Sequence, residues 1–352
     1  MELAASRVLT PDGFVGPAKV VVEDDRIVAI EPVPSAPDRV LAPGFVDLQV
    51  NGVDDQDCAS SRADWDRLEQ LQLATGVTTW CPTLVTAPLD DLRARVDRVP
   101  PRDTIAGIHL EGPFLGGRPG AHPPELLRPI DRDWLDALPE SVRIITIAPE
   151  LDGAVDATRA LTARGVTVSL GHSAATLDQV RACVDAGASM VTHLFNGMPT
   201  LHHRDPGIVG AALTDDRLVA GIIADLVHVH ATAISVAFRA KAHRMALVTD
   251  AVAWRAARIG RIEIAHDGTA PRLPDGTLAG SSLTMDLAVR NVVHEAGVPL
   301  PLALEAASTT PATVIGLRDR GRLVVGARAD LVALDPDALT VAAVWSGGRE
   351  VA

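Results

Sequence analysis

The sequence predicts a (β/α)₈ barrel with a small β domain built from both chain ends, and three observations support this prediction. Short apolar segments alternate with segments of helical periodicity eight times between residues 43 and 320. The apolar segments are continuous, as expected for parallel strands that are buried on both faces. The two chain ends instead carry short strand-like pieces that prolines and acidic residues interrupt. A doubly wound sheet is the weaker alternative.

Eight candidate strands and six candidate helices follow one another along the chain. The strands are Gly44–Val50, Val77–Thr83, Ile105–Leu110, Arg143–Ala148, Val166–Leu170, Ser189–Leu194, Val219–Ala224 and Met245–Asp250. The helices are Ala63–Ala74, Leu89–Val96, Asp133–Leu138, Val155–Ala163, Leu177–Ala186 and Thr232–His243. Glycines at 76, 165 and 187 fall where C-terminal caps of three of these helices are expected.

The two ends of the chain read as short strands, and neither is long enough to bury a core alone. The candidate strands are Lys19–Val22, Arg26–Ile30, Arg39–Ala42, Leu323–Val325, Asp330–Leu334, Val341–Trp345 and Arg349–Val351. We therefore expect residues 1–42 and 322–352 to pair into one small β-sandwich domain. Residues 43–321 form the barrel in this interpretation.

Composition excludes several classes of protein. The net charge is −13 over 352 residues and basic runs are absent, which argues against a nucleic-acid-binding protein. No stretch of about 18 apolar residues exists that would span a membrane, and the first residues lack the pattern of a signal peptide. The three widely spaced cysteines predict neither a disulfide framework nor a CxxC metal site. We expect a cytoplasmic protein.

Four polar residues stand at the ends of candidate strands. Glu111, His172, His193 and Asp250 each end or follow one of the apolar segments. Barrel enzymes carry their reactive groups at the carboxyl ends of the strands, so these side chains are expected to converge. Two imidazoles and a carboxylate can hold one divalent metal with a position left open for water, and a second carboxylate can take the proton of that water.

Each of these residues also has a structural explanation. Glu111 is compatible with a solvated loop acid, and His172 and His193 with histidines that serve only the packing. Asp250 is compatible with an acceptor of backbone hydrogen bonds at a helix start. Their common position at strand ends favours a shared metal site. His109 points away from its chain neighbours in an extended strand, so we expect it to pack beside the site.

Ordered motifs extend over nearly the whole chain. They are PGFVDLQVNG (43–52), GVTTWCPTL (76–84), HLEGPFL (109–115), GAHPPELL (120–127), APE (148–150), GHSAAT (171–176), THLFNGMP (192–199), HHRDPGIVG (202–210), GIIAD (221–225), VTDA (248–251), LAGSSLTM (278–285) and GARADLVALD (326–335). In this order they closely resemble the N-acetylglucosamine-6-phosphate deacetylase family of the amidohydrolase superfamily. The resemblance implies a (β/α)₈ barrel with a small β domain from both termini, in agreement with the pattern of elements.

The resemblance also implies roles for the residues of the reaction centre. Glu111, His172 and His193 match the ligands of a single catalytic metal. Asp250 matches the general base and acid, and His122 matches the histidine that polarises the acetyl carbonyl. The implied reaction is hydrolysis of N-acetylglucosamine 6-phosphate to glucosamine 6-phosphate and acetate.

Four further residues match contacts to the phosphorylated sugar. His228 corresponds to a substrate-contacting histidine, and Asn196 and Gly197 correspond to backbone contacts near the phosphate. Arg204 corresponds to the cationic partner of the phosphate, which the resemblance places in a neighbouring subunit. The resemblance therefore implies a homodimer that completes each site with an arginine from the other chain.

The first strand carries Gln49 and Asn51 where many amidohydrolases have an HxH pair for a second metal. Amide side chains are poor ligands beside imidazole and carboxylate, so we expect one divalent metal per chain. Zinc is the expected ion, and the same ligands also accept iron, cobalt or manganese.

Two other functions stay open at this point. One is a deacetylase of another N-acyl amino sugar, such as N-acetylgalactosamine 6-phosphate. The other is a non-catalytic amidohydrolase-like protein, which the retention of all four strand-end residues disfavours. Two segments bear on the first alternative. After Asp250 the chain reads AVAWRAARIGRIEI, where relatives usually have a Gly/Pro-rich turn, and Leu226 stands where a glycine is common.

Overall fold

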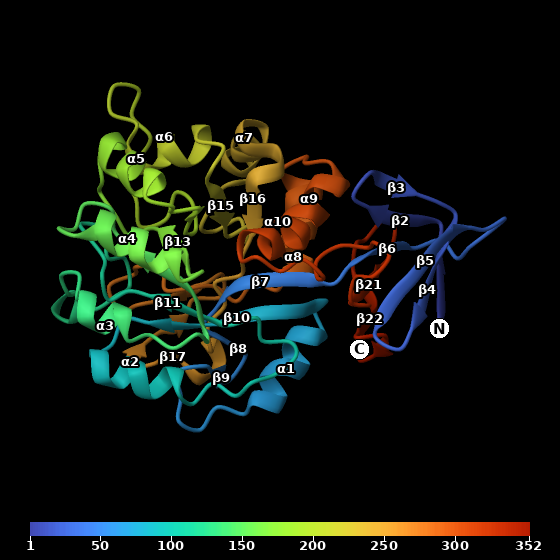
Figure 1. Cartoon of the computed structure of the whole chain (residues 1–352), viewed down its shortest axis with the longest axis horizontal. Coiled ribbons are helices and arrows are strands. Elements are labelled where there is room, and N and C mark those ends of the chain that lie inside the picture. The colour runs from blue at the N-terminus through green and yellow to red at the C-terminus, as the bar shows by residue number, and fades with distance from the viewer.

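The computed structural model describes all 352 residues, and an eight-stranded parallel sheet forms its centre. In sheet order the strands are β7 (Phe45–Val50), β10 (Val77–Val85), β11 (Ile108–Glu111), β12 (Val142–Ile147), β13 (Thr167–Leu170), β14 (Met190–Val191), β15 (Val219–Ile222) and β16 (Met245–Leu247). Val50 at the end of β7 pairs in parallel with Ala251 beyond β16, which closes the ring. The predicted (β/α)₈ barrel is confirmed, and the doubly wound sheet is excluded (Figure 1).

Helices connect the strands of the barrel. They are α1 (Trp65–Leu73), α2 (Leu89–Val96), α3 (Arg132–Asp136), α4 (Ala154–Ala163), α5 (Leu177–Asp185), α6 (Gly207–Thr214) and α7 (Ala231–Lys241), followed after β16 by α8 (Met285–Arg290), the π-helix η4 (Asn291–Glu295), α9 (Leu300–Ala307) and α10 (Thr309–Val314). All six predicted helices are present within a few residues of their expected bounds. Helix α6 was not predicted because its residues are nearly all apolar and buried, so its sequence lacks the periodicity of an amphipathic helix.

Two strands of the barrel end three residues earlier than predicted. The predicted strand Ser189–Leu194 is reduced to β14, and Met245–Asp250 is reduced to β16. The physical reason is the backbone of the polar residues that follow, since φ is +29° at His193 and +48° at Asp250. A residue with positive φ cannot continue a strand, so the strands stop before these side chains.

Strands from both chain ends share one six-stranded sheet in the order β23, β22, β21, β6, β2, β3. Their bounds are β2 (Arg7–Thr10), β3 (Gly13–Val15), β6 (Val40–Pro43), β21 (Leu331–Leu334), β22 (Val341–Ser346) and β23 (Arg349–Glu350). A second sheet holds β1 (Glu2–Ala5), β4 (Ala18–Glu23) and β5 (Arg26–Pro32). Figure 1 shows these blue and red strands together beside the barrel. The boundaries at residues 42 and 322 stay a proposal.

The predicted strand Leu323–Val325 is wrong. These residues lead into a turn in which the amide of Gly326 donates to the carbonyl of Ile27 and the amide of Ala327 donates to that of Val324. The apolar side chains that suggested a strand have other environments, since Leu323 is buried in the core of the two end sheets and Val325 is exposed.

A segment after β16 folds over the carboxyl end of the barrel. It contains η3 (Trp254–Ala256), β17 (Arg258–Ile259), β18 (Ile262–Glu263), β19 (Ala265–His266) and β20 (Pro271–Arg272). Its apolar side chains form a small cluster of their own with Val85 at the end of β10. The other short elements are β8 (Gly52–Val53), β9 (Gln56–Asp57), η1 (Pro124–Leu126) and η2 (Ala242–Arg244).

None of the helices has the length and apolar character needed to cross a membrane. The predicted cytoplasmic location stays a prediction from the sequence.

Candidate metal centre

A cavity of about 220 Å³ lies at the carboxyl end of the barrel strands. Eight of the nine predicted site residues line it: Glu111, His122, His172, His193, Asn196, Gly197, His228 and Asp250. Arg204 is the exception. The apolar part of the wall includes Ile259 and Ile262, which come from the covering segment after β16. Both residues lie in the stretch AVAWRAARIGRIEI that follows Asp250.

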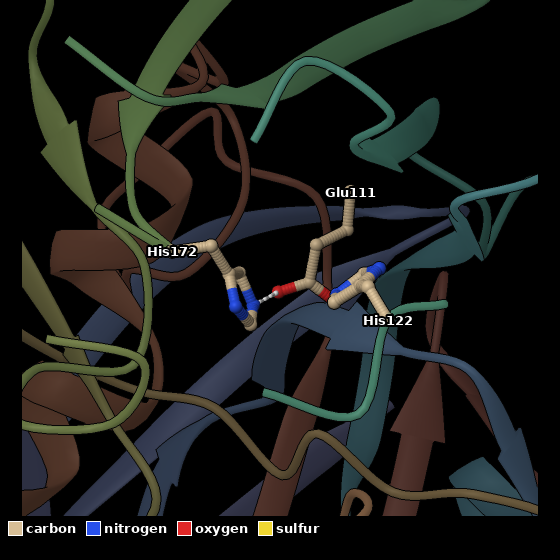
Figure 2. Close-up of side chains that lie close together, drawn as sticks. All are labelled: Glu111, His122 and His172. Carbon is tan, nitrogen blue, oxygen red and sulfur yellow. Dashed lines mark hydrogen bonds and ion pairs between the residues drawn. The ribbon is translucent and has the colours of Figure 1, made fainter. Parts of the chain in front are cut away.

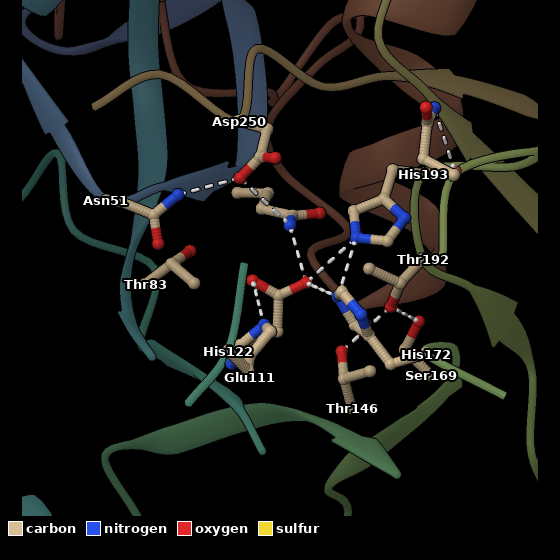
Figure 3. Close-up of polar contacts among 12 residues, drawn as sticks. Asn51, Thr83, Glu111, His122, Thr146, Ser169, His172, Thr192, His193 and Asp250 are labelled. Atoms are coloured by element: carbon tan, nitrogen blue, oxygen red, sulfur yellow. Dashed lines mark hydrogen bonds and ion pairs between the residues drawn. The ribbon is translucent and has the colours of Figure 1, made fainter. Parts of the chain in front are cut away.

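Three potential ligand atoms form a compact triangle at the bottom of the site (Figure 3). Oε1 of Glu111 lies 3.1 Å from Nε2 of His172 and 3.0 Å from Nε2 of His193, and the two Nε2 atoms are 3.0 Å apart. All three residues are buried. A tetrahedral ion with ligands at about 2.0–2.1 Å separates those ligands by about 3.3 Å, so the triangle has the size that a divalent ion requires.

His122 lies on the other side of Glu111 (Figure 2). Its Nε2 is 3.9 Å from Oε2 of Glu111, and Glu111, His122 and His172 also form a group with ligand atoms within 4.8 Å of one another. This second group is looser than the triangle with His193. Nδ1 of His122 is occupied by the hydroxyl of Thr86 at 2.8 Å. The geometry therefore favours His193 over His122 as the third ligand.

The ring of His172 is oriented by a backbone carbonyl. Its Nδ1 lies 3.2 Å from the carbonyl oxygen of Arg118, which can only accept, so Nδ1 carries a proton, and in the neutral ring Nε2 presents a lone pair to Glu111. Nδ1 of His193 is buried and has no partner. Acceptor atoms that face one another at about 3 Å are stable only with a proton or a cation between them, which fits a bound metal.

Burial and neighbouring charges shift the pKa values of Glu111, His122 and Asp250. Burial by itself would raise the pKa of Glu111, but hydrogen bonds and charges from His172 and His193 outweigh it and hold the pKa well below its usual range. Burial, and next the charge of His172, lowers the pKa of His122 to about 3, so its ring is neutral. Burial and then the nearby charge of Glu111 raise the pKa of Asp250 to about 8. A cation in the site would favour the ionised form of Asp250.

The amide of Gln49 links the two carboxylates of the site, and the amide of Asn51 contacts one of them. Nε2 of Gln49 donates to Oε1 of Glu111 at 3.0 Å and to Oδ1 of Asp250 at 3.1 Å. Nδ2 of Asn51 donates to the same Asp250 oxygen at 2.7 Å. Both donors meet Oδ1, which leaves Oδ2 of Asp250 free for another partner. Both amides of the first strand are therefore engaged as hydrogen-bond donors to the carboxylates of the site.

Three site residues have left-handed backbone conformations. φ is +48° at His172, +29° at His193 and +48° at Asp250. Such conformations cost non-glycine residues on the order of 1–3 kcal/mol each and persist only where the surroundings hold them. Each of the three residues stands two or three positions after a barrel strand, so the turn of the backbone aims the side chain across the mouth instead of along the sheet.

A buried layer of hydrogen bonds lies beneath the triangle. His109 donates from Nδ1 to the carbonyl of Leu48 at 3.0 Å, and Nε2 accepts from the hydroxyl of Thr146 at 2.8 Å. The hydroxyl of Thr146 is hydrogen-bonded to the hydroxyl of Thr192, which is also hydrogen-bonded to the hydroxyl of Ser169. All of these side chains are fully buried. His109 therefore packs below the site, in line with the expectation from its strand position.

The remaining predicted residues lie at one side of the cavity or outside it. Nδ1 of His228 is 2.7 Å from a carboxylate oxygen of Asp225, which fixes its ring beside Asn196 and Gly197 in the cavity wall. Arg204 is exposed on the loop between β14 and α6, where Nη1 lies 2.8 Å from the ring of His203. The structure of one chain therefore does not bring Arg204 to the site.

The sequence interpretation overlooked Thr86, which positions His122. Thr86 directly follows β10, a strand for which no polar residue was named. The rule that polar residues at strand ends carry function would have identified it. The apolar residues Ile259 and Ile262 gave no such signal, since nothing in their sequence indicates which apolar side chains face a cavity.

Comparison with known proteins extends the similarity over the whole chain. The model of the amidohydrolase family matches residues 40–351. The N-acetylgalactosamine-6-phosphate deacetylase of Escherichia coli O157:H7 is 40% identical over 370 residues, which cover 99% of this chain and 98% of that protein. The N-acetylglucosamine-6-phosphate deacetylase of Bos taurus is 42% identical over 342 residues, with 89% and 83% covered.

A solved structure agrees with these sequence matches. It is a point mutant of the N-acetyl-D-glucosamine-6-phosphate deacetylase of Mycobacterium smegmatis in complex with N-acetyl-D-glucosamine-6-phosphate. The two structures superpose with a TM-score of 0.91 at 36% identity, covering 100% of this chain and 99% of the other.

Proposed function

The chain belongs to the amidohydrolase family and is a hydrolytic enzyme, and we propose that it removes the acetyl group from N-acetylglucosamine 6-phosphate. The observation that carries the proposal is the triangle of Glu111, His172 and His193 with Asp250 beside it in one cavity. The relatives from Bos taurus and Mycobacterium smegmatis support the choice of substrate, because both are named for this reaction.

Glu111, His172 and His193 would hold one divalent ion, with zinc as the proposed metal and iron, cobalt or manganese as ions that the same ligands accept. When bound, such an ion acts as a Lewis acid and lowers the pKa of water to about 7. The donors Gln49 and Asn51 support a single ion per chain, because the amide of Gln49 bridges the two carboxylates and the amide of Asn51 donates to Asp250.

Asp250 moves the proton in this mechanism. Hydrogen bonds from Gln49 and Asn51 hold its Oδ1, so Oδ2 is free to accept a proton from the attacking water. Oxygen of water bonds to the carbonyl carbon of the acetamide, and the C–N bond then breaks. Asp250 returns its proton to the departing nitrogen, which leaves as an amine. The products are acetate and glucosamine 6-phosphate.

His122 stabilises the oxygen of the acetyl group. Its ring is neutral because burial, followed by the charge of His172, lowers its pKa to about 3. When the hydroxyl of Thr86 donates to Nδ1, the ring proton is on Nε2, which lines the cavity. A neutral N–H donor in a buried site is suited to stabilise charge that develops on a carbonyl oxygen.

The phosphate end of the substrate requires a cation, which we propose is Arg204 of a second subunit. Asn196, Gly197 and His228 form one side of the cavity, but no lysine or arginine of the same chain lines it. Arg204 is exposed on a loop outside the cavity. An arginine can make two parallel hydrogen bonds to a phosphate. A homodimer that exchanges these loops would complete both sites.

N-acetylgalactosamine 6-phosphate is the second candidate substrate. The relative from Escherichia coli O157:H7, which is named for this sugar, matches nearly the full length of both chains. The residues Ile259 and Ile262, which line the cavity, belong to the segment that departs from the family pattern. The two sugars differ only in the orientation of one hydroxyl group, which residues of this wall could distinguish.

The proposal is tested by measuring acetate and free amine from each sugar phosphate with zinc-loaded protein. We expect equal amounts of acetate and glucosamine 6-phosphate from N-acetylglucosamine 6-phosphate. Faster release from the galactosamine compound would assign the second candidate, and no release from either compound would overturn both.

A further inference from the structure

The loops that carry His122 and His172 hold each other in place. The amide of Gly116 donates to the carbonyl of His172 at 2.9 Å, and Nδ1 of His172 donates to the carbonyl of Arg118 at 3.2 Å. Both Gly116 and Arg118 belong to the loop after β11, which also carries His122. The orientation of the His172 ring therefore depends on the position of the neighbouring loop.

Glu150 joins these two loops. It follows β12, the strand between β11 and β13 in the sheet. Its Oε1 accepts from the amide of Gly117 at 3.0 Å and from the amide of Ala174 at 2.8 Å, and its Oε2 accepts from the hydroxyl of Ser173. One carboxylate thus receives three hydrogen bonds, from the His122 loop on one side and from the His172 loop on the other.

The backbone of the neighbouring loop packs tightly against the carboxylate of Glu150. A Cβ atom on Gly116 would lie 2.0 Å from Oε1 of Glu150, so the loop can approach the carboxylate only with glycine at this position. Ser173 is fully buried. Its amide donates to the carbonyl of Gly197 at 3.0 Å, which links the same junction to the loop after β14.

The junction also accounts for the backbone of His172. φ at His172 is +48°, a conformation that needs restraint from outside. The two residues that follow, Ser173 and Ala174, are the ones that Glu150 binds. Glu150 itself does not line the cavity, so its influence on the site must pass through these loops.

We propose that Glu150 is a positioning residue of the metal centre. It holds Nε2 of His172 near Oε1 of Glu111, where the metal would bind. It also holds Nε2 of His122 near Oε2 of Glu111. The inference rests on the proposed metal centre and deepens it, because it assigns the orientation of one ligand to a carboxylate that touches neither the metal nor the substrate.

The test measures how fast zinc-loaded protein releases its metal to a coloured chelator, without any sugar present. Loss of a group that orients a metal ligand typically costs about 10- to 100-fold in metal affinity or activity. We therefore expect Glu150→Ala to release zinc about 10- to 100-fold faster than the wild type. Glu150→Gln should stay within about threefold of the wild type, because its carbonyl still accepts both amides and its NH₂ can donate to Ser173.

Glu69→Ala is the matched control. Glu69 is also a half-buried carboxylate with two donor residues, Arg102 and Thr104, but it joins α1 to a loop that does not line the cavity. Glu69→Ala is expected to lower the unfolding temperature and leave the zinc release rate unchanged. If Glu150→Ala behaves in the same way, Glu150 serves stability only and the proposal is wrong.

A second variant covers the case in which Glu150→Ala does not fold. Ser173→Ala removes the hydrogen bond to Glu150 and also the one that Ser173 Oγ accepts from the amide of Ala175. Loss of the bond to Glu150, worth about 0.5–1.5 kcal/mol, should speed zinc release about 2- to 13-fold. An unchanged rate in Ser173→Ala would contradict the proposal. Since sugar is absent, a failure of the proposed substrate leaves this result unaffected, and a chain that binds no zinc would refute the metal centre separately.

Discussion

Nε2 of His172 faces Nε2 of His193 across 3.0 Å, with Oε1 of Glu111 completing the triangle. Two imidazole lone pairs and a carboxylate oxygen at this separation repel one another unless a positive charge lies among them. The three strands that carry these residues are fixed by the barrel, so the side chains have little freedom to separate. The arrangement is therefore selective for a cation.

We predict one divalent metal per chain, held by this triangle. Elemental analysis of protein purified without chelator should find about one equivalent, and His193→Ala should lose it because the triangle then has two members. The control His243→Ala removes an exposed histidine that pairs with Glu305 outside the cavity and should keep the metal. Two equivalents per chain would show that Gln49 and Asn51 do not exclude a second ion.

Asp250→Asn should retain the metal and bind substrate but lose most of its turnover. Asparagine keeps the shape of the side chain and cannot carry a proton. General acid–base catalysis contributes about 10²- to 10⁴-fold, so kcat should fall by that factor while metal content stays at the wild-type value. A variant that keeps more than about a tenth of the wild-type rate would remove Asp250 from the mechanism.

Sequence patterns predicted that Glu111, His172 and His193 converge, because they occupy a position that the barrel dictates, at the ends of parallel strands. The pattern could not predict Glu150 as a junction, since two of the three donors it binds are backbone amides of Gly117 and Ala174. Nearly every residue type carries a backbone amide, so the sequence does not indicate which residues make this contact. The left-handed turns at His193 and Asp250 were hidden for a related reason, because neither residue is a glycine that would have indicated positive φ.

Asp47 is predicted to make the protein less stable as the pH rises. It is fully buried, and burial raises its pKa from 3.8 to about 7 against the opposing hydrogen bonds of Thr249 and Gln49. Between these values the folded chain keeps the proton and the unfolded chain releases it, so stability falls from about pH 4 to pH 7 and stays low above. A pKa difference of about 3 units between the unfolded and folded chains corresponds to about 4 kcal/mol of unfolding free energy.

Asp47→Asn removes this dependence, because asparagine cannot ionise. Thr249 Oγ1 donates to Oδ2 of Asp47 in the wild type, and the amide nitrogen of asparagine at that place can instead donate to Oγ1 of Thr249. Thermal unfolding of both proteins at pH 5 and pH 8 provides the measurement. The variant should gain in stability relative to the wild type on going from pH 5 to pH 8. An equal difference between the two proteins at both pH values would contradict the assignment.

Arg204→Ala should raise KM for the phosphorylated sugar and barely change KM for the unphosphorylated sugar. Loss of a charge-assisted hydrogen bond is worth roughly 1.5–3 kcal/mol, or about 10- to 150-fold in KM. Arg159→Ala, which removes an exposed arginine on the outer helix α4, is the matched control and should leave KM unchanged.

The exchange of Arg204 between subunits has its own measurement. Mixing Arg204→Ala chains with Asp250→Asn chains should create one intact site per heterodimer, built from the native Asp250 of one chain and the native Arg204 of the other. Activity above the sum of the two parents is expected. If heterodimers form and no activity is gained, Arg204 acts in its own chain or has no role.

The central claim is that a metal-dependent site in this barrel hydrolyses the acetamide of N-acetylglucosamine 6-phosphate. The most direct measurement gives zinc-reconstituted protein an equal mixture of this compound and N-acetylgalactosamine 6-phosphate and follows acetate and both amines over time. We predict one acetate per amine, glucosamine 6-phosphate formed at least about tenfold faster than its epimer, and loss of both signals on chelation. The account would be contradicted by a protein with one zinc per chain that releases no acetate, or that consumes the galactosamine compound first.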